Sequence, residues 1–229
     1  MSAARQALAG DRLRREYVTP MYSQMDVARI VGAPTSTVHR WAEGYSDRGL
    51  RKPPLIALTK PGRGYTVPFV GLAQAFVLWS FRRAGVPMQR IRPAVEALEQ
   101  GIGLEYALAS DRLVTDGAEV LWRAEPGAAD TRMIVVRSGQ AVFNEVVGEY
   151  LKQIRFSDGY ASSFGLPRFD RLPVTVDPLV NGGRPTIVDR GIAVDDVLGR
   201  LRAGETTGSI ADDFDLDEAD VRSLLFQAA

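Results

Sequence analysis

The side chains of residues 22–41 have the types and spacing needed to contact DNA bases. Ser23 can cap a helix, and the run Gly-Ala-Pro ends that helix and begins a second one. Val38 and Trp41 lie three residues apart on the second helix and are expected to pack inward. The outward face then carries four polar or cationic side chains: Thr35, Ser36, His39 and Arg40. Such side chains on an exposed helix can enter the major groove, so the pattern predicts a DNA-reading helix-turn-helix. A small helical packing unit without a nucleic-acid role is the alternative.

A basic turn follows the second helix. Two β-prone runs, residues 55–59 (LIALT) and 65–69 (YTVPF), flank the turn KPGRG. A hairpin at this place would act as a wing and lay Lys60, Arg63 and Tyr65 against DNA phosphates. The alternative for Arg63 is a solvated turn charge.

Two further helices are expected over residues 72–85 and 86–101, because apolar side chains recur at helical spacing in both. The order helix-turn-helix, wing and helix pair, over about residues 21–103, resembles the DNA-binding domain of MerR-type regulators. The resemblance implies double-stranded DNA as a partner. This sequence departs from the metal-sensing members of that group, because it has no cysteine to bind a metal.

The sequence lacks the side chains on which most enzyme sites depend. It contains no cysteine, and His39 is its one histidine, which excludes thiolate nucleophiles, zinc-thiolate sites and a serine–histidine–aspartate triad built on any other histidine. The scattered acids of the middle region are expected to be solvated surface, and a metal-dependent nuclease site is the alternative: Asp111, Asp116, Glu119 and Glu125. The run NGGRP lacks the Gly-Lys-Ser/Thr ending of a phosphate-binding loop. We expect no catalytic residue, no metal site and no cofactor.

The net charge of zero hides a gradient along the chain. Residues 1–65 carry eleven Lys and Arg against five Asp and Glu, whereas residues 191–229 carry three against nine. The first segment suits a polyanion and the last repels one. No apolar run approaches the roughly 20 residues that span a bilayer, and the N-terminus has no apolar signal core, which predicts a cytoplasmic protein.

The periodicities predict an α+β chain that is mainly α. Strands are expected over 113–123 and 132–139, a helix over 140–154, then a short strand PVTVD and three short C-terminal helices. The core of these three helices is expected to contain Val194, Val197, Leu198, Leu201, Ile210, Phe214, Val221 and Leu224. The expected domains are a flexible N-terminus over 1–20, a winged helix-turn-helix over 21–103, a mixed connecting region over 104–172, and an acidic, helix-turn-helix-like domain over 173–229.

The C-terminal segment resembles a widespread bacterial domain of unknown function that is predicted to be the antitoxin part of toxin–antitoxin pairs. The residues that carry the match are Gly183-Arg184-Pro185, Ile187, Gly191, Val194-Asp195-Asp196-Val197, Arg202-Ala203-Gly204-Glu205, Ile210-Ala211, Phe214 and Val221. Where that family usually shows Gly-Thr-Arg-Ile, this chain has Asp-Arg-Gly-Ile at 189–192, which puts any role of the missing Thr-Arg pair in doubt. A helix-turn-helix in front of such a domain looks like the layout of some VapB-type antitoxins.

The combined resemblance implies an antitoxin that neutralises a PIN-type ribonuclease toxin and represses its own promoter. Because specific DNA sites are usually read by two-fold pairs, a homodimer is expected. The acidic end would contact the toxin through Asp212, Asp213, Asp215, Asp217, Glu218 and Asp220. A solvated acidic face is the alternative for these side chains. The alternative function is a stand-alone winged-helix regulator whose middle region senses a ligand.

Overall fold

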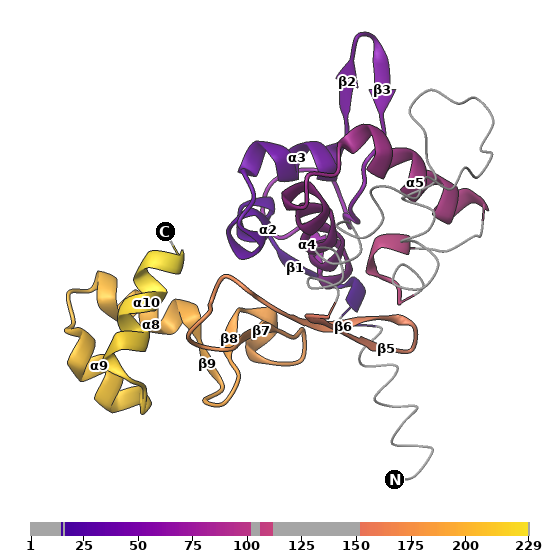
Figure 1. Ribbon diagram of the computed structural model, residues 1–229. Helices are drawn as coiled ribbons and strands as arrows, with labels where there is room; N and C mark the ends of the chain where they lie inside the picture. Colours follow the sequence, from indigo (N-terminus) through magenta and orange to yellow (C-terminus); the bar gives the residue numbers. More distant parts are fainter. Residues whose placement is uncertain (1–14, 16, 102–105, 112–151, 229) are drawn as a thin grey trace. The chain divides into compact units, whose positions relative to one another are not determined.

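The structure forms two compact units (Figure 1). This computed structural model describes residues 15, 17–101, 106–111 and 152–228. The N-terminal unit lies within Tyr17–Ala161. The C-terminal unit comprises Ser162–Ala229 and, of the described residues before Tyr17, Arg15. Helices and strands are mixed, as predicted. The strands expected over 113–123 and 132–139, and nearly all of the helix expected over 140–154, lie outside the described residues.

The predicted helix-turn-helix is confirmed as α2 (Gln24–Val31) and α3 (Thr35–Glu43). Ser23 caps α2, because its hydroxyl accepts a hydrogen bond from the Asp26 amide at 3.1 Å while the Asp26 carboxylate accepts one from the Ser23 amide at 3.0 Å. Gly32 ends α2 with a φ of 74°, a value that a residue without a Cβ adopts easily. Val38 and Trp41 are buried between the two helices and the rest of the unit, as their spacing predicted.

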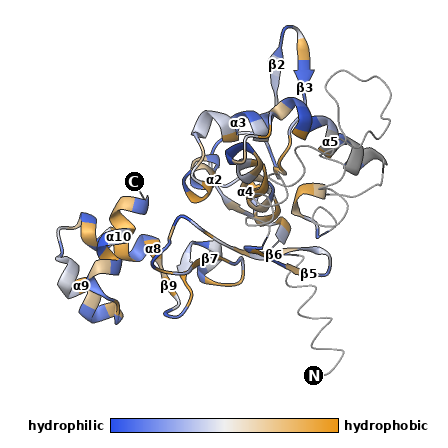
Figure 2. Ribbon diagram, viewed as in Figure 1, coloured by the Kyte–Doolittle hydropathy of each residue, from blue (hydrophilic) through white to orange (hydrophobic). Residues whose placement is uncertain are grey.

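The second helix pair is also confirmed, as α4 (Phe69–Arg83) and α5 (Met88–Gly101). Almost every side chain of α4 is buried, so this helix forms the centre of the N-terminal unit. Figure 2 shows hydrophobic residues along it. Gly71 of α4 is required for close packing, since a Cβ there would lie 2.4 Å from the main-chain oxygen of Ala57. No helix within the described ranges is long and apolar enough to cross a membrane.

The wing lies earlier in the chain than the sequence predicted. Strands β2 (Tyr45–Asp47) and β3 (Leu50–Lys52) form an antiparallel hairpin that follows α3 directly. Its two-residue turn has positive φ at both positions, 48° at Arg48 and 81° at Gly49, which is the type I′ geometry that matches strand twist.

The hairpin expected over residues 55–69 is therefore wrong. The amides of Leu55 and Ile56 donate to the main-chain oxygen of Trp41, at 2.7 and 3.3 Å, instead of to a neighbouring strand. The next amide, that of Ala57, donates to the buried side chain of Gln74 at 2.7 Å. The main-chain amides that would pair with a neighbouring strand are thus hydrogen-bonded to α3 and α4 instead.

Only the end of that segment is extended. Strand β4 (Val67–Pro68) pairs with β1 (Pro20–Tyr22), the short strand that precedes α2. A short 3-10 helix, η1 (Ala107–Ala109), packs against α4 and α5.

The remaining strands form one sheet in the order β5-β6-β7-β8-β9, and the boundary between the units falls inside β6. The strands are β5 (Ile154–Ser157), β6 (Tyr160–Gly165), β7 (Val174–Val176), β8 (Thr186–Ile187) and β9 (Ile192–Ala193). The pairings β6–β7, β7–β8 and β8–β9 are antiparallel. The predicted Asn-Gly-Gly turn is a 3-10 helix, η3 (Asn181–Gly183), between β7 and β8.

Three short helices follow, as predicted: α8 (Val194–Arg202), α9 (Thr207–Phe214) and α10 (Glu218–Ala228). Most of their expected core is buried, but Leu201 and Phe214 are half-buried. The guanidinium carbon of Arg200 lies 5.0 Å from the centre of the Phe214 ring and covers it. The C-terminal unit is therefore a small antiparallel sheet followed by a three-helix cluster.

Candidate nucleic-acid interface

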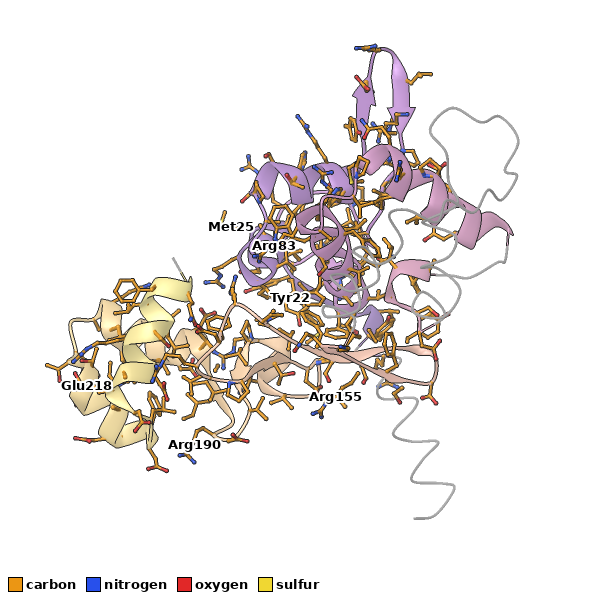
Figure 3. The ribbon with its side chains drawn as sticks, viewed as in Figure 1. Tyr22, Met25, Arg83, Arg155, Arg190 and Glu218 are labelled. Carbon is orange, nitrogen blue, oxygen red and sulfur yellow. The ribbon has the colours of Figure 1, made fainter. Side chains whose placement is uncertain are left out.

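The outward face of α3 carries the side chains for which a base-reading role was predicted. Thr35, Ser36, His39 and Arg40 are all exposed, on the side opposite the buried Val38 and Trp41. Figure 3 shows side chains of α3 and of the β2–β3 hairpin projecting from the body of the N-terminal unit. The structure thus brings together the four residues for which a base-reading role was predicted.

The hairpin is tied to the end of α3 and projects beyond it (Figure 1). Nη2 of Arg51 donates a hydrogen bond to the main-chain oxygen of Glu43, the last residue of α3, at 3.0 Å. Gly44 makes the tight exit from α3 possible, because its φ is 71° and an added Cβ would lie 2.4 Å from the main-chain oxygen of Lys52. Helix and hairpin therefore meet in a fixed geometry.

Tyr45 at the base of the hairpin contacts two guanidinium groups. The guanidinium carbons of Arg40, on α3, and Arg92, on α5, each lie 5.8 Å from the centre of its ring. Arg92 is only 7% exposed, and its Nη1 donates to the main-chain oxygen of Pro53 at 2.6 Å. Its Nη2 has no hydrogen-bond partner among the described residues. The position of the hairpin is thus set from both α3 and α5.

The residues predicted for the wing lie on a loop instead. Lys60, Arg63 and Tyr65 are exposed there, and the loop is closed by a hydrogen bond from the Thr59 amide to the Thr66 main-chain oxygen at 2.9 Å. The amide of Gly62 lies 3.4 Å from Oε1 of Glu43, which holds the loop near the end of α3. We call this segment, residues 59–66, the basic loop.

The sequence reasoning missed the cations of the hairpin. Arg48 sits in the turn and is exposed, and Arg51 and Lys52 lie on β3. With the predicted residues they form one set of cations on α3, the hairpin and the basic loop: Arg40, Arg48, Arg51, Lys52, Lys60 and Arg63. The Gly that follows Asp47-Arg48 was the available signal for a tight turn. Cations on a helix, the hairpin that follows it and a nearby loop suit a polyanionic ligand.

The acidic residues of the C-terminal unit are exposed to different extents, and several are already paired. Ion pairs join Asp213 to Arg200, Asp215 to Arg190, Glu218 to Arg222 and Asp220 to Arg171. Figure 3 labels Glu218 and Arg190 among them. Asp212 and Asp217 make no ion pair within the described part of the chain.

Hydrogen bonds shift the ionisation of two glutamates in the C-terminal unit. The Thr207 hydroxyl, and then the Arg222 guanidinium, hold the pKa of Glu218 below its usual range. The Arg200 guanidinium has the same effect on the pKa of Glu205, because it donates to both carboxylate oxygens. These carboxylates remain charged in mildly acidic solution.

The described residues contain no group of three or more side chains that could hold a metal ion. Of the four scattered acids, Asp111 is described and partly buried, whereas Asp116, Glu119 and Glu125 lie outside the described residues.

Two family profiles match the chain. One, described as a putative DNA-binding HTH domain, matches residues 20–95, and the other, described as a protein of unknown function (DUF433), matches residues 174–226. The first covers α2, α3, the hairpin and the basic loop, and the second covers the three-helix cluster.

Curated proteins of Mycobacterium tuberculosis (strain ATCC 25618 / H37Rv) are similar over nearly the whole chain. "Putative antitoxin VapB45" is 43% identical over 235 residues, which cover 95% of this chain and 98% of that protein. "Uncharacterized protein Rv2308" is 27% identical over 213 residues, which cover 90% and 88%. The X-ray crystal structure of Rv2018 from the same species superposes with a TM-score of 0.74 at 41% identity, covering 92% of this chain and 99% of that one.

Proposed function

The chain belongs to the family of VapB45, and we propose that it is the antitoxin of a type II, VapBC-like module. It binds and neutralises a PIN-type ribonuclease toxin and represses its own promoter. The observation that carries this proposal is the exposed polar face of α3 beside the projecting basic hairpin, in a chain whose relative bears the name "Putative antitoxin VapB45".

DNA recognition divides between the parts of the N-terminal unit. Thr35, Ser36, His39 and Arg40 contact base edges in the major groove, because they are hydrogen-bonding side chains on an exposed helix. The hairpin and the basic loop contact phosphates, which position the protein without reading sequence. Tyr65, two-thirds exposed, packs its ring against the sugar-phosphate backbone from the basic loop.

The promoter complex is a homodimer on an inverted repeat. A single helix-turn-helix reads only a few base pairs, and two-fold pairs spaced about one helical turn apart are the usual solution. Light scattering at micromolar concentration should give twice the 25.0 kDa of one chain. A mass of one chain would contradict this part of the proposal.

The C-terminal unit binds the toxin. A ribonuclease needs a basic groove for RNA, and an acidic surface is complementary to it. Asp212 and Asp217 offer charges without an internal ion pair in the described residues, and Asp213, Asp215, Glu218 and Asp220 add to the field. Phe226 of α10 is 84% exposed and supplies an aromatic anchor of the kind that dominates protein interfaces.

Co-expression with the adjacent reading frame tests both roles. If a small ribonuclease-like protein is encoded there, it should co-purify with this chain and lose its RNase activity. Phe226→Ser and Asp212→Asn/Asp217→Asn should weaken that complex without changing promoter binding. Leu179→Ser is the matched control, because it removes an exposed apolar side chain from the C-terminal unit at a place outside α10 and the acidic residues.

The alternative function has a distinct signature in the same experiment. A chain that binds its upstream DNA but neither binds nor inhibits the neighbouring product would be a stand-alone regulator. A chain that inhibits the ribonuclease but binds no DNA would remove the repressor role.

A further inference from the structure

Gln24, in the first turn of α2, contacts two side chains of α3 at once. Its amide nitrogen Nε2 donates to Oε1 of Glu43 at 2.9 Å, and its amide oxygen Oε1 lies 2.9 Å from Nδ1 of His39. The same Glu43 oxygen receives the Gly62 amide of the basic loop. A continuous chain of hydrogen bonds therefore runs from the basic loop to the one histidine of the protein.

The donor and acceptor groups in this series of hydrogen bonds determine which ring nitrogen of His39 carries a hydrogen. A carboxylate is an acceptor only, so the Gln24 amide must turn its NH₂ group toward Glu43. Its oxygen is then the group that faces His39, and an oxygen can only accept. Nδ1 of His39 must therefore carry the hydrogen.

The other ring nitrogen of His39, Nε2, can accept a hydrogen bond from a ligand. When Nδ1 of a neutral imidazole carries the hydrogen, Nε2 is an acceptor. His39 is exposed on the outward face of α3, and its Nε2 has no hydrogen-bond partner among the described residues. An acceptor on a DNA-reading helix selects a donor, and in the major groove the donors are the amino groups of adenine (N6) and cytosine (N4).

We propose that His39 is a specificity-determining residue that accepts a hydrogen bond from an exocyclic base amino group, and that Gln24 and Glu43 are positioning residues that hold its ring in this state. This inference rests on the proposed DNA-binding function of α3. It specifies which nucleobase group His39 contacts. The exposure of the His39 side chain alone would fit either a donor or an acceptor. Guanine and thymine offer only acceptors in the major groove, so neither can be the base that His39 contacts.

The first test reads the tautomer in the free, full-length protein. Because His39 is the only histidine, a long-range ¹H–¹⁵N spectrum of the neutral ring contains a single imidazole. Nδ1 should be of the protonated type and Nε2 of the bare type. Gln24→Met keeps a helix-forming side chain of similar length and should abolish this preference. A ring protonated at Nε2 in the unaltered protein would overturn the inference, whatever DNA binding proves to be.

The second test removes one amino group at a time from a duplex of the chain's own upstream region. Purine in place of adenine, and 2-pyrimidinone in place of cytosine, delete the amino group and distinguish the two bases. At one position in each half-site the deletion should weaken binding roughly 3- to 10-fold, the size of one neutral hydrogen bond. In His39→Phe, which keeps a ring but has no acceptor, the same deletion should cost nothing.

The outcomes separate this inference from the proposed function. If the duplex binds but no amino deletion depends on His39, the base contact is wrong and DNA binding by α3 stands. If no duplex binds at all, the proposed function fails, and the base contact fails with it even when the spectrum shows the hydrogen on Nδ1.

Discussion

Arg51 of the hairpin donates a hydrogen bond to the main-chain oxygen of Glu43, the last residue of α3. A cation at this place satisfies a carbonyl that has no partner inside the helix and complements the negative end of the helix dipole. The same residue, Glu43, uses its side chain to hold Gln24 and the basic loop. Helix, hairpin and loop therefore meet at one residue, and we expect them to engage DNA as a rigid set.

Replacing Arg40 tests the reading face. Arg40→Ala should cost roughly 1–3 kcal/mol of specific binding, because it removes the guanidinium that we propose contacts a base edge. The protein should remain folded, since Arg40 is exposed. Fluorescence anisotropy with the upstream duplex gives the affinity. Arg202→Ala removes the same charge from an exposed site in the C-terminal unit and should have little effect. Equal affinities for the two variants would remove Arg40 from the interface.

Neutralising the cations of the basic loop should change the salt dependence of DNA affinity more than it changes the preference for one DNA sequence over another. Each phosphate contact releases counterions, so the slope of log K against log salt should fall by about 0.9 for each cation that no longer meets a phosphate. Lys60→Met/Arg63→Met should therefore flatten the slope by nearly two and weaken all duplexes alike. Arg48→Met, at the hairpin turn, should add about one more. An unchanged slope in the double variant would place the basic loop outside the interface.

The parts of the fold that were predicted depend on local signals. Ser23, Gly32 and the pair Val38 and Trp41 act within one helix or one turn, where capping, a positive φ and side-chain periodicity are written in neighbouring residues. The three C-terminal helices followed from the same kinds of signal. The outward face of α3 could be predicted because an inward face was unmistakable.

The misplaced wing shows where local signals fail. The run LIALT has high β propensity, yet Leu55 and Ile56 are buried and hydrogen-bonded to the end of α3, a tertiary effect that overrides propensity. The true hairpin has strands of three residues with little apolar alternation, and Arg48 stands where Asn or Asp usually opens a type I′ turn. The contact between Gln24 and His39 joins two helices and could not be read from either alone.

Arg92 should matter for binding more than for stability. Arg92→Met removes the hydrogen bond to Pro53 and the contact with Tyr45, but it also removes a buried Nη2 that has no partner in the described residues. The two effects have opposite sign and are each worth about 1–3 kcal/mol, so they largely cancel and the free energy of unfolding should change by no more than about 2 kcal/mol. Urea denaturation measures this quantity.

DNA binding should respond differently to the same variant. The hairpin loses its support from α5, so affinity for every duplex should fall. Arg90→Met, an exposed change on the same helix, is the control. If Arg92→Met bound DNA as tightly as the unaltered chain, the hairpin would not need α5 to hold its place.

The ion pair between Arg200 and Glu205 makes part of the stability of the C-terminal unit depend on pH. Hydrogen bonds from Arg200 hold the pKa of Glu205 below its ordinary value of 4.5. The unfolded chain therefore binds more protons than the folded one as the pH falls through this range, and stability rises with pH there. The contribution is present above about pH 4.5 and disappears as the pH falls through the lowered pKa of the folded state. Solvent screening keeps it small, because both groups reach the surface.

Glu205→Gln should consequently be less stable than the unaltered chain at pH 7, and the difference in melting temperature should shrink as the pH is lowered toward 3. Calorimetry on the full chain at several pH values measures this difference. Asp189→Asn is the matched control, since Asp189 is exposed and makes no ion pair in the described part of the chain, and its difference should be small at every pH. If the difference in melting temperature caused by Glu205→Gln persisted unchanged at pH 3, packing, and not the charge of Glu205, would stabilise the loop between α8 and α9.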